Sequence, residues 1–257
     1  MIKTKYYIIT AILALILFLI TNIPANIVIN SIKGQIPQVK IQNVSGTLWN
    51  GSAKQITIQN KYILKNVDWS ICIAHLLLAE ACIELDLMYN KNPLSGQLSI
   101  DINNTVQAKD IKTTMTAQAL SQIITIPMAE ISGDIHIDLE TLNWKQDSIP
   151  SATGIIKWNK ASVTIAETAQ LGDITVTLSD SEDNPINAEI SNTNGQLAIA
   201  GTALLKTTAD YNLNLTLTPN NKASKNLKSS LSLFAKPKKD GSFILKNNGN
   251  LKRLGLI

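Results

Sequence analysis

The sequence predicts a mainly β protein: an N-terminal transmembrane helix, then a curved antiparallel β-sheet or partly open β-barrel with one or two short helices. Three observations favour this fold class. Only 16% of the 257 residues are charged, while Ile, Leu, Val, Thr, Asn and Ser dominate, as on half-buried pleated surfaces. One long apolar segment stands at the N-terminus. Along the rest of the chain, alternation with a period of two recurs without a βαβ pattern.

The apolar segment Tyr6–Ile23 follows Lys3 and Lys5 and contains no charged residue. Its length nearly matches the roughly 20 residues that a helix needs to cross the hydrocarbon core of a bilayer. Positive charge before the segment predicts a cytoplasmic N-terminus. We therefore expect residues 1–24 to form a cytoplasmic tip and a membrane anchor, and residues 25–257 to form a β-rich domain outside the cytoplasm.

A cleaved signal peptide is the alternative interpretation of this segment, because a basic start and an apolar stretch fit that pattern as well. Cleavage after Ala25 would place the bulky Ile23 where a small residue is wanted. Apolar character also continues through Ile27 to Ile29. These features favour the anchor.

Two cysteines, Cys72 and Cys82, lie in the exported part of the chain. An oxidising compartment makes a disulfide between them chemically reasonable. The bond would close a short loop and stabilise the fold by about 3 kcal/mol in the chain-entropy description. Two buried free thiols are the alternative, since cysteine packs as a small hydrophobe.

The clearest strand covers residues 211–218, where Tyr and Leu side chains alternate with Asn and Thr. Similar alternation covers residues 135–139 and 174–178, and glycines punctuate such runs where the chain must reverse. Three segments each combine a Gly turn, a strand and a Trp: residues 45–58, 132–144 and 153–166. They predict strand-turn-strand units in an antiparallel meander, with two related halves that divide near residues 147–151. Only Ala74–Ala81 and Thr116–Ile124 look helical.

A search for convergent polar residues finds no convincing catalytic, cofactor-binding or metal site. The best candidate is the run of Asp134, His136 and Asp138, continued by Glu140, which alternation places on one strand face. Such a set suggests a weak cation site at most. We favour the solvated face of an amphipathic strand, because the opposite face is aliphatic. His75 adjoins an apolar run and is interpreted as a packed or capping histidine.

The four tryptophans, Trp49, Trp69, Trp144 and Trp158, all lie in or at the end of predicted strands. They could line a sugar or lipid groove. We expect core positions instead, because strand aromatics bury a large area and no polar cluster accompanies them.

The C-terminal residues 219–257 contain nine Lys or Arg residues and a single acidic one, Asp240. Such a segment would suit an anionic membrane or an acidic partner. A solvated surface is the favoured interpretation, since spaced lysines usually cover an exposed face. No aromatic stacking platform is interleaved with them, so nucleic acid is not an expected partner.

In this order, the features resemble the type II secretion system protein N family, also called general secretion pathway protein N. The resemblance covers nearly the whole chain. After the single anchor come VSGTLWNGSA, VDW with a leucine-rich turn, and ALSQIITIPMAEISGDIHIDLETLNW. The later segments are GIIKWNKASVTIAETAQLGDITVTL, SNTNGQLAIAGTALLKTTADYNLNLTLTPN and DGSFILKNNGNL. The family's order and spacing of these segments is more distinctive than any one of them.

The resemblance implies a single-pass protein of the bacterial inner membrane with its bulk in the periplasm. It implies a non-enzymatic role, without cofactors, in exporting folded proteins across the outer membrane, through contacts with other inner-membrane or periplasmic secretion components. The periplasmic part also looks similar to the AsmA-like group of β-groove proteins. The alternative function is therefore a lipid-binding or lipid-transfer module.

Overall fold

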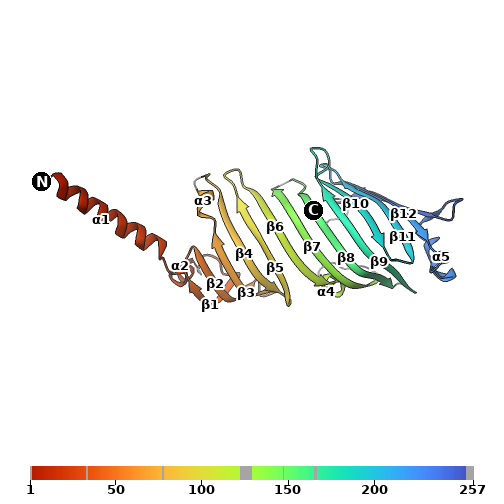
Figure 1. Cartoon of the computed structure of the whole chain (residues 1–257), viewed down its shortest axis with the longest axis horizontal. Helices are drawn as coiled ribbons and strands as arrows, with labels where there is room; N and C mark the ends of the chain where they lie inside the picture. Colours follow the sequence, from red (N-terminus) through yellow and green to blue (C-terminus); the bar gives the residue numbers. More distant parts are fainter. Residues whose placement is uncertain are drawn as a thin grey trace. The chain divides into compact units, whose positions relative to one another are not determined.

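In the computed structural model, the chain divides into two compact units, Met1–Ser99 and Ile100–Ile257, called unit 1 and unit 2 below (Figure 1). The structure describes residues 2–32, 34–76, 78–121, 129–146, 148–164 and 167–252. The predicted division into related halves near residues 147–151 stays a prediction, and residue 147 lies outside the described residues.

Unit 1 consists of an N-terminal helical part and a run of strands (Figure 1). Its elements are α1 (Ile2–Thr21), α2 (Ala25–Ile32), β1 (Val39–Gly46), β2 (Asn50–Ile58), β3 (Tyr62–Ile71), α3 (Ile73–Leu76), β4 (Ala81–Tyr89) and β5 (Asn92–Ile100). The strands lie in sequence order from β1 to β5. The pairs β1–β2, β2–β3 and β3–β4 are antiparallel, as a meander of short connections requires.

The predicted apolar segment forms helix α1, whose side chains from Tyr6 onward are exposed on all sides. The helix ends at Thr21, where the side chains of Thr21 and Asn22 donate hydrogen bonds to carbonyls of the preceding turn. Among the described residues, no helix combines the length and the apolarity needed to cross a membrane. The transmembrane helix expected over Tyr6–Ile23 is therefore not found there.

The turn between β1 and β2 holds the end of α1. The indole Nε1 of Trp49 donates a hydrogen bond to the Ile20 carbonyl at 2.7 Å, and the Leu48 amide donates one to the Ile23 carbonyl at 2.8 Å. Pro24 forms an isolated bridge with Thr47. These contacts satisfy carbonyls that a helix leaves unpaired at its C-terminus. The turn therefore attaches the end of α1 to the sheet.

Unit 2 contains the longer strands (Figure 1). Its elements are β6 (Thr105–Thr116), α4 (Ala117–Ser121), β7 (Glu130–Lys145), β8 (Ser151–Thr164), β9 (Thr168–Ser179), β10 (Ile186–Thr193), β11 (Leu197–Leu205), β12 (Asp210–Pro219), α5 (Lys225–Leu231), β13 (Lys236–Pro237) and β14 (Phe243–Asn250).

The strands of unit 2 pair antiparallel in sequence order from β6 to β12, and β14 then pairs with β12. The short β13 covers only the start of β14, opposite Phe243 and Ile244. Within the described residues, β1 in unit 1 and β13 in unit 2 each have one strand neighbour, so neither unit closes. The predicted class is confirmed in its coarse form: mainly β, antiparallel and open, with a few short helices.

The core of unit 2 lies between one face of its strands and the two helices α4 and α5. Trp158 on β8 packs against two clusters of buried side chains. One cluster joins the sheet to α5 through Leu227 and Leu231, and the other joins it to α4 through Ala117. On β12 the predicted alternation is confirmed, since Leu217 is buried in this core while its polar neighbours face outward.

Two glycines allow β7 and β8 to pass each other closely. The register between these strands shifts on either side of Gly133 and again opposite Gly154, which marks two β-bulges. Gly133 has a φ of 118°, and a Cβ there would lie 2.5 Å from the Asn159 carbonyl oxygen and 2.8 Å from the Trp158 indole nitrogen. Its missing side chain lets the Trp158 Nε1 donate to the Ser132 carbonyl at 2.9 Å.

Each of the two predicted helical segments contains a short helix. Among the described residues between β3 and β4, the helix is α3, and the left-handed Ala79 (φ 57°) leads into β4 at Ala81, so the helix predicted over Ala74–Ala81 does not reach its expected end. The segment predicted over Thr116–Ile124 forms α4 from Ala117 to Ser121, and its last three residues lie outside the described part of the chain. Helix α5 was not predicted, although Ser224 caps it and accepts a hydrogen bond from the Leu227 amide.

Asp173, in the middle of β9, ties an irregularity in β8 to the turn between β10 and β11. Its carboxylate accepts hydrogen bonds from the Lys160 amide at 2.9 Å and from the Asn194 side chain at 3.3 Å. Both partners have left-handed backbones, with φ of 49° and 62°. The Lys160 amide, followed by the Asn194 side chain, holds the pKa of the Asp173 carboxyl below its ordinary value of 3.8.

Asp173→Asn should lower the thermal unfolding midpoint near neutral pH, and this difference should shrink in acid. The folded state favours the carboxylate, so its stabilising effect is complete above the unfolded pKa and is lost as pH falls through the lower folded pKa. Circular dichroism melts from about pH 7 to about pH 2 check this. Glu189→Gln, on the exposed face of β10, is the matched control. A difference that stays constant over the whole pH range would contradict the prediction.

Candidate functional site

The polar run on β7 lies on an exposed strand face. Asp134, His136 and Asp138 are all exposed and alternate with half-buried or buried Ile side chains. His136 stands opposite Thr114 on β6, whose hydroxyl lies 3.2 Å from its Nδ1, and opposite Lys157 on β8. In the part of the chain that the structure describes, no three His, Cys, Asp or Glu residues gather in a way that could hold a metal ion.

His75 lies in the connection between β3 and β4 and pairs with a carboxylate. Its Nδ1 is 2.8 Å from Glu80 Oε2, and the Glu80 amide also donates to the His75 carbonyl at 3.1 Å. The two side chains close the connection on itself. A His–carboxylate pair of this kind orients an imidazole, but general base catalysis would also need a nucleophile within its reach.

A disulfide joins Cys72 and Cys82 at the base of the same connection, with their Cα atoms 5.2 Å apart. The Cys72 amide donates to the Cys82 carbonyl at 3.0 Å. On β5, the Gln97 side chain points its Nε2 at both sulfurs, at 3.3 and 3.0 Å. The disulfide therefore clamps β3 to β4 just where the two strands part.

Three of the four tryptophans use the indole N–H to reach a main-chain carbonyl. Trp49 reaches Ile20, Trp69 reaches Leu48 at 3.1 Å, and Trp158 reaches Ser132. The core expectation fits Trp158 best. It is wrong for Trp144, which is 50% exposed near the end of β7 and belongs to neither buried cluster of unit 2.

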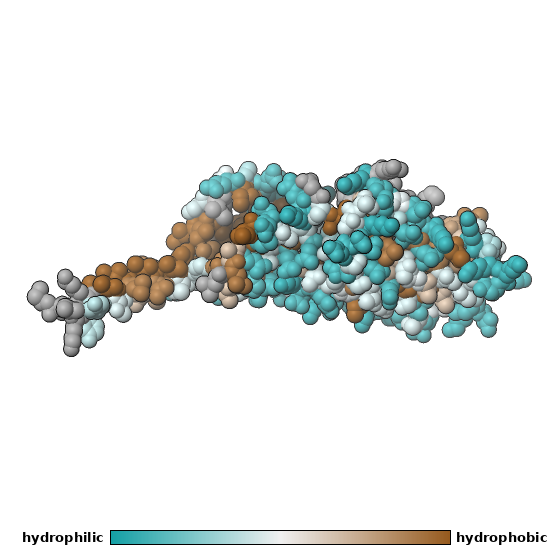
Figure 2. Space-filling model, turned by 90° about the horizontal axis from the view of Figure 1, so that it is seen from above, coloured by the Kyte–Doolittle hydropathy of each residue, from teal (hydrophilic) through white to brown (hydrophobic). Residues whose placement is uncertain are grey.

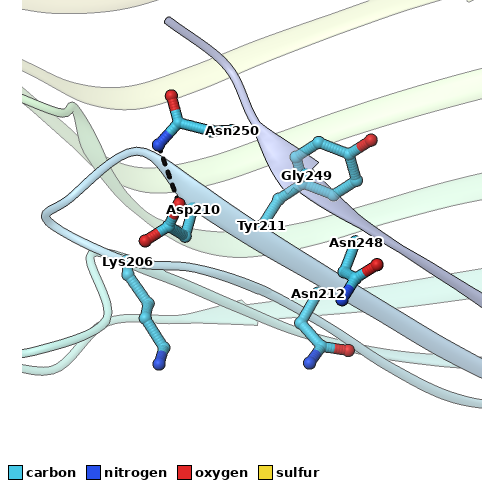
Figure 3. A pocket seen from close by; sticks show the side chains of 7 residues that line it. All are labelled: Lys206, Asp210, Tyr211, Asn212, Asn248, Gly249 and Asn250. Atoms are coloured by element: carbon cyan, nitrogen blue, oxygen red, sulfur yellow. Dashed lines mark hydrogen bonds between the residues drawn. The ribbon is translucent and has the colours of Figure 1, made fainter. Parts of the chain in front are cut away.

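One pocket in unit 2 is lined by residues from the start of β12 and the end of β14, and its cavity volume is about 530 Å³ (Figure 3). Three asparagines contribute side-chain amides to its lining. Its lining residues are Lys206, Asp210, Tyr211, Asn212, Asn248, Gly249 and Asn250.

Hydrogen bonds between β12 and β14 shape this pocket. Asn250 Nδ2 donates to Asp210 Oδ1 at 2.7 Å and to the Thr208 carbonyl at 3.1 Å. The Tyr211 ring occupies the place that a side chain at Gly249 would take, since a Cβ there would lie 2.8 Å from the ring. Such amides and an aromatic face can bind a polar group, but they supply no activated nucleophile.

Sequence reasoning missed the pocket because its two strands are far apart in the chain. The segment 206–212 and the segment 248–250 meet only because β14 skips over α5 and β13 to pair with β12. The DGSFILKNNGNL segment gave the one available signal, an Asn-rich stretch directly after a strand-like run.

The comparison with known families decides the identity. A family model described as type II secretion system (T2SS), protein N, matches residues 37–246. The chain belongs to the type II secretion system protein N family. The match begins just before β1 and ends within β14, so it covers the strands of both units. No curated protein and no solved structure matches the chain.

Membership in the protein N family confirms the resemblance drawn from the sequence. The protein is a component of the type II secretion system, a family of generally non-enzymatic members, and its location is membrane-associated or periplasmic. Its partners are other components of that system. The comparisons give no support to the AsmA-like likeness or to the lipid-transfer alternative.

Proposed function

We propose that this protein N family member is a non-enzymatic component at the bacterial inner membrane that assists export of folded proteins across the outer membrane. It acts through protein–protein contacts in the periplasm. The observation that carries the proposal is the family match over residues 37–246. The match extends through the strands of both units, so the proposal concerns the β-rich body of the protein.

The arrangement of reactive side chains supports a role without catalysis. Asp134, His136 and Asp138 point into solvent from one strand face, and His75 is paired with Glu80 inside one connection. The amide-rich pocket on β12 and β14 has no nucleophile beside a base. Catalysis needs such groups to converge on one reacting atom, and these groups are distributed over separate surfaces.

Helix α1 supports a place at the membrane. From Tyr6 to Thr21 its side chains are exposed, and nearly all of them are apolar (Figure 2). A helix that is apolar all round is covered by protein or by lipid in its working state. The adjoining Lys3 and Lys5 would suit the charged lipid surface. We therefore propose that α1 holds the chain at the inner membrane.

Open strand edges are the proposed contact surfaces for other secretion components. In unit 2, β13 pairs only with Phe243 and Ile244, and β14 continues as far as Asn250. In unit 1, β1 is an edge strand, with β2 as its one neighbour among the described strands. An edge strand offers its main-chain groups to an added strand, and side chains along it select the partner.

Secretion of a folded enzyme into the medium tests the proposal, in a strain that lacks its own copy of the gene. The triple variant Asp134→Asn, His136→Ala, Asp138→Asn should restore secretion as the unchanged chain does, since exposed strand-face changes are usually within about 0.5 kcal/mol. The double variant Leu13→Arg, Ile16→Arg should fail, because a charged side chain within the apolar surface of α1 opposes its contact with lipid.

The double variant Leu13→Ala, Ile16→Ala is the matched control, because it changes the same exposed positions and leaves the contacts of Ile20 and Ile23 in place. Immunoblots establish that all variants are equally abundant. Loss of secretion with an abundant, folded triple variant would overturn the non-enzymatic role. Normal secretion with the Arg variant would overturn the membrane role of α1.

A further inference from the structure

The connection between β3 and β4 displays an apolar tip that unit 1 does not cover. Ile73, Leu76 and Leu78 are 57%, 45% and 75% exposed, and all three lie within six residues of each other. We infer that this tip, residues 73–76 with 78 and 79, is a second membrane contact that enters a lipid surface beside helix α1. The inference rests on the proposed membrane role of α1 and adds a separate site to it.

Hydrogen bonds connect the tip to the end of α1 through the turn between β1 and β2. Trp49 donates its indole N–H to the Ile20 carbonyl at the end of α1. The carbonyl of the same Trp49 accepts the Ile71 amide at 2.7 Å, and Ile71 is the last residue of β3. The tip therefore begins two residues after a direct contact with the residue that holds α1.

The apolar surface of α1 and the tip thus lie at the same end of unit 1. Figure 2 shows apolar side chains along α1 and on the part of unit 1 that adjoins it. If lipid covers α1, the tip is within reach of the same lipid surface. This continuity favours a lipid surface over a protein partner for the tip.

The connection carries few ionisable side chains. Between Cys72 and Cys82 they are His75 and Glu80, and His75 Nδ1 lies 2.8 Å from Glu80 Oε2. This contact satisfies part of the polar surface that would otherwise face the headgroup layer. The rest of the connection is Ile, Ala and Leu.

The base of the connection is fixed. The Cys72–Cys82 disulfide clamps both ends, and Gln97 contacts both sulfurs. Ala79 has a left-handed backbone, with a φ of 57°. A connection whose ends are held in this way loses less entropy on entering an interface than an unconstrained loop would.

Site-specific fluorescence in reconstituted vesicles tests the inference. Leu78→Cys is labelled with an environment-sensitive NBD dye under non-reducing conditions, which leave the native disulfide closed. The full-length protein is placed in phosphatidylethanolamine and phosphatidylglycerol vesicles that contain acyl-chain nitroxide lipids. Ile73→Cys is a second probe of the tip. Leu13→Cys reports on α1, and Leu233→Cys, at an 86% exposed position in unit 2, is the aqueous control.

We expect blue-shifted emission and nitroxide quenching at positions 13, 73 and 78, and neither effect at position 233. An interfacial segment sits about 5–10 Å into the headgroup and acyl boundary, so shallow nitroxides should quench the tip more than deep ones. Quenching at position 13 without quenching at positions 73 and 78 would overturn the proposed membrane contact of the tip and leave the membrane role of α1 intact. No quenching at any of these positions would overturn both.

Discussion

Replacing Trp158 by Ala should reduce the free energy of unfolding of unit 2 by about 3–5 kcal/mol, the usual result of truncating a large core side chain. The indole packs against both buried clusters of the unit, so its loss opens the contact with α4 and with α5 together. It also removes the hydrogen bond to the Ser132 carbonyl. For a unit of this size the melting midpoint should fall by on the order of 10 °C.

Two variants separate the contributions. Trp158→Phe keeps an aromatic ring but has no N–H, so it should lose about 1 kcal/mol for the hydrogen bond and part of the packing. Trp144→Ala removes the same side chain from a half-exposed position and should change stability by less than about 1 kcal/mol. Equal losses at positions 144 and 158 would show that Trp158 is not the link between the clusters.

Removing the disulfide with Cys72→Ala and Cys82→Ala should destabilise unit 1 by about 3 kcal/mol, since the two cysteines close a short loop in the unfolded chain. The sequence separation is 10 residues. Denaturant unfolding with and without a reductant measures the effect. The reductant should lower the midpoint of the unchanged protein and leave the double variant where it was.

Gln97→Leu is a useful companion to the cysteine variants, because it removes the amide that faces both sulfurs without opening the bond. It should cost no more than about 1 kcal/mol. If the reductant moved the midpoint of the double variant as much as that of the unchanged protein, the bond would not be the source of the stability.

The strands were predictable where one face is buried and the other is not. At 211–218 the alternation of Leu with Asn and Thr follows directly from a sheet covered on one side, and β12 extends one residue further at each end. The family could also be predicted, because the order of many soft segments is more specific than any one of them.

Features that depend on partners distant in sequence were not predictable. The exposure of Trp144 depends on which strand residues pack against the helices. The pocket beside Tyr211 depends on β14 skipping two elements to reach β12. Helix α5 is too short for its apolar spacing, Leu227 and Leu231, to stand out from loop sequence. The attachment of α1 through Trp49 is one hydrogen bond from a side chain that looked like a core anchor.

The order of strands in unit 2 also governs how this sheet can assemble. Each strand from β7 to β12 pairs with the strand made just before it, so a chain that emerges from its N-terminus can add one hairpin at a time over short loops. The last step is different, because β14 cannot pair with the outer edge of β12 until residues 220–242, which lie between the two strands, have been synthesised. During that interval β12 is an unpaired edge strand, and such an edge can pair with a strand of another chain. A chain truncated before Phe243 would keep this edge permanently and should aggregate.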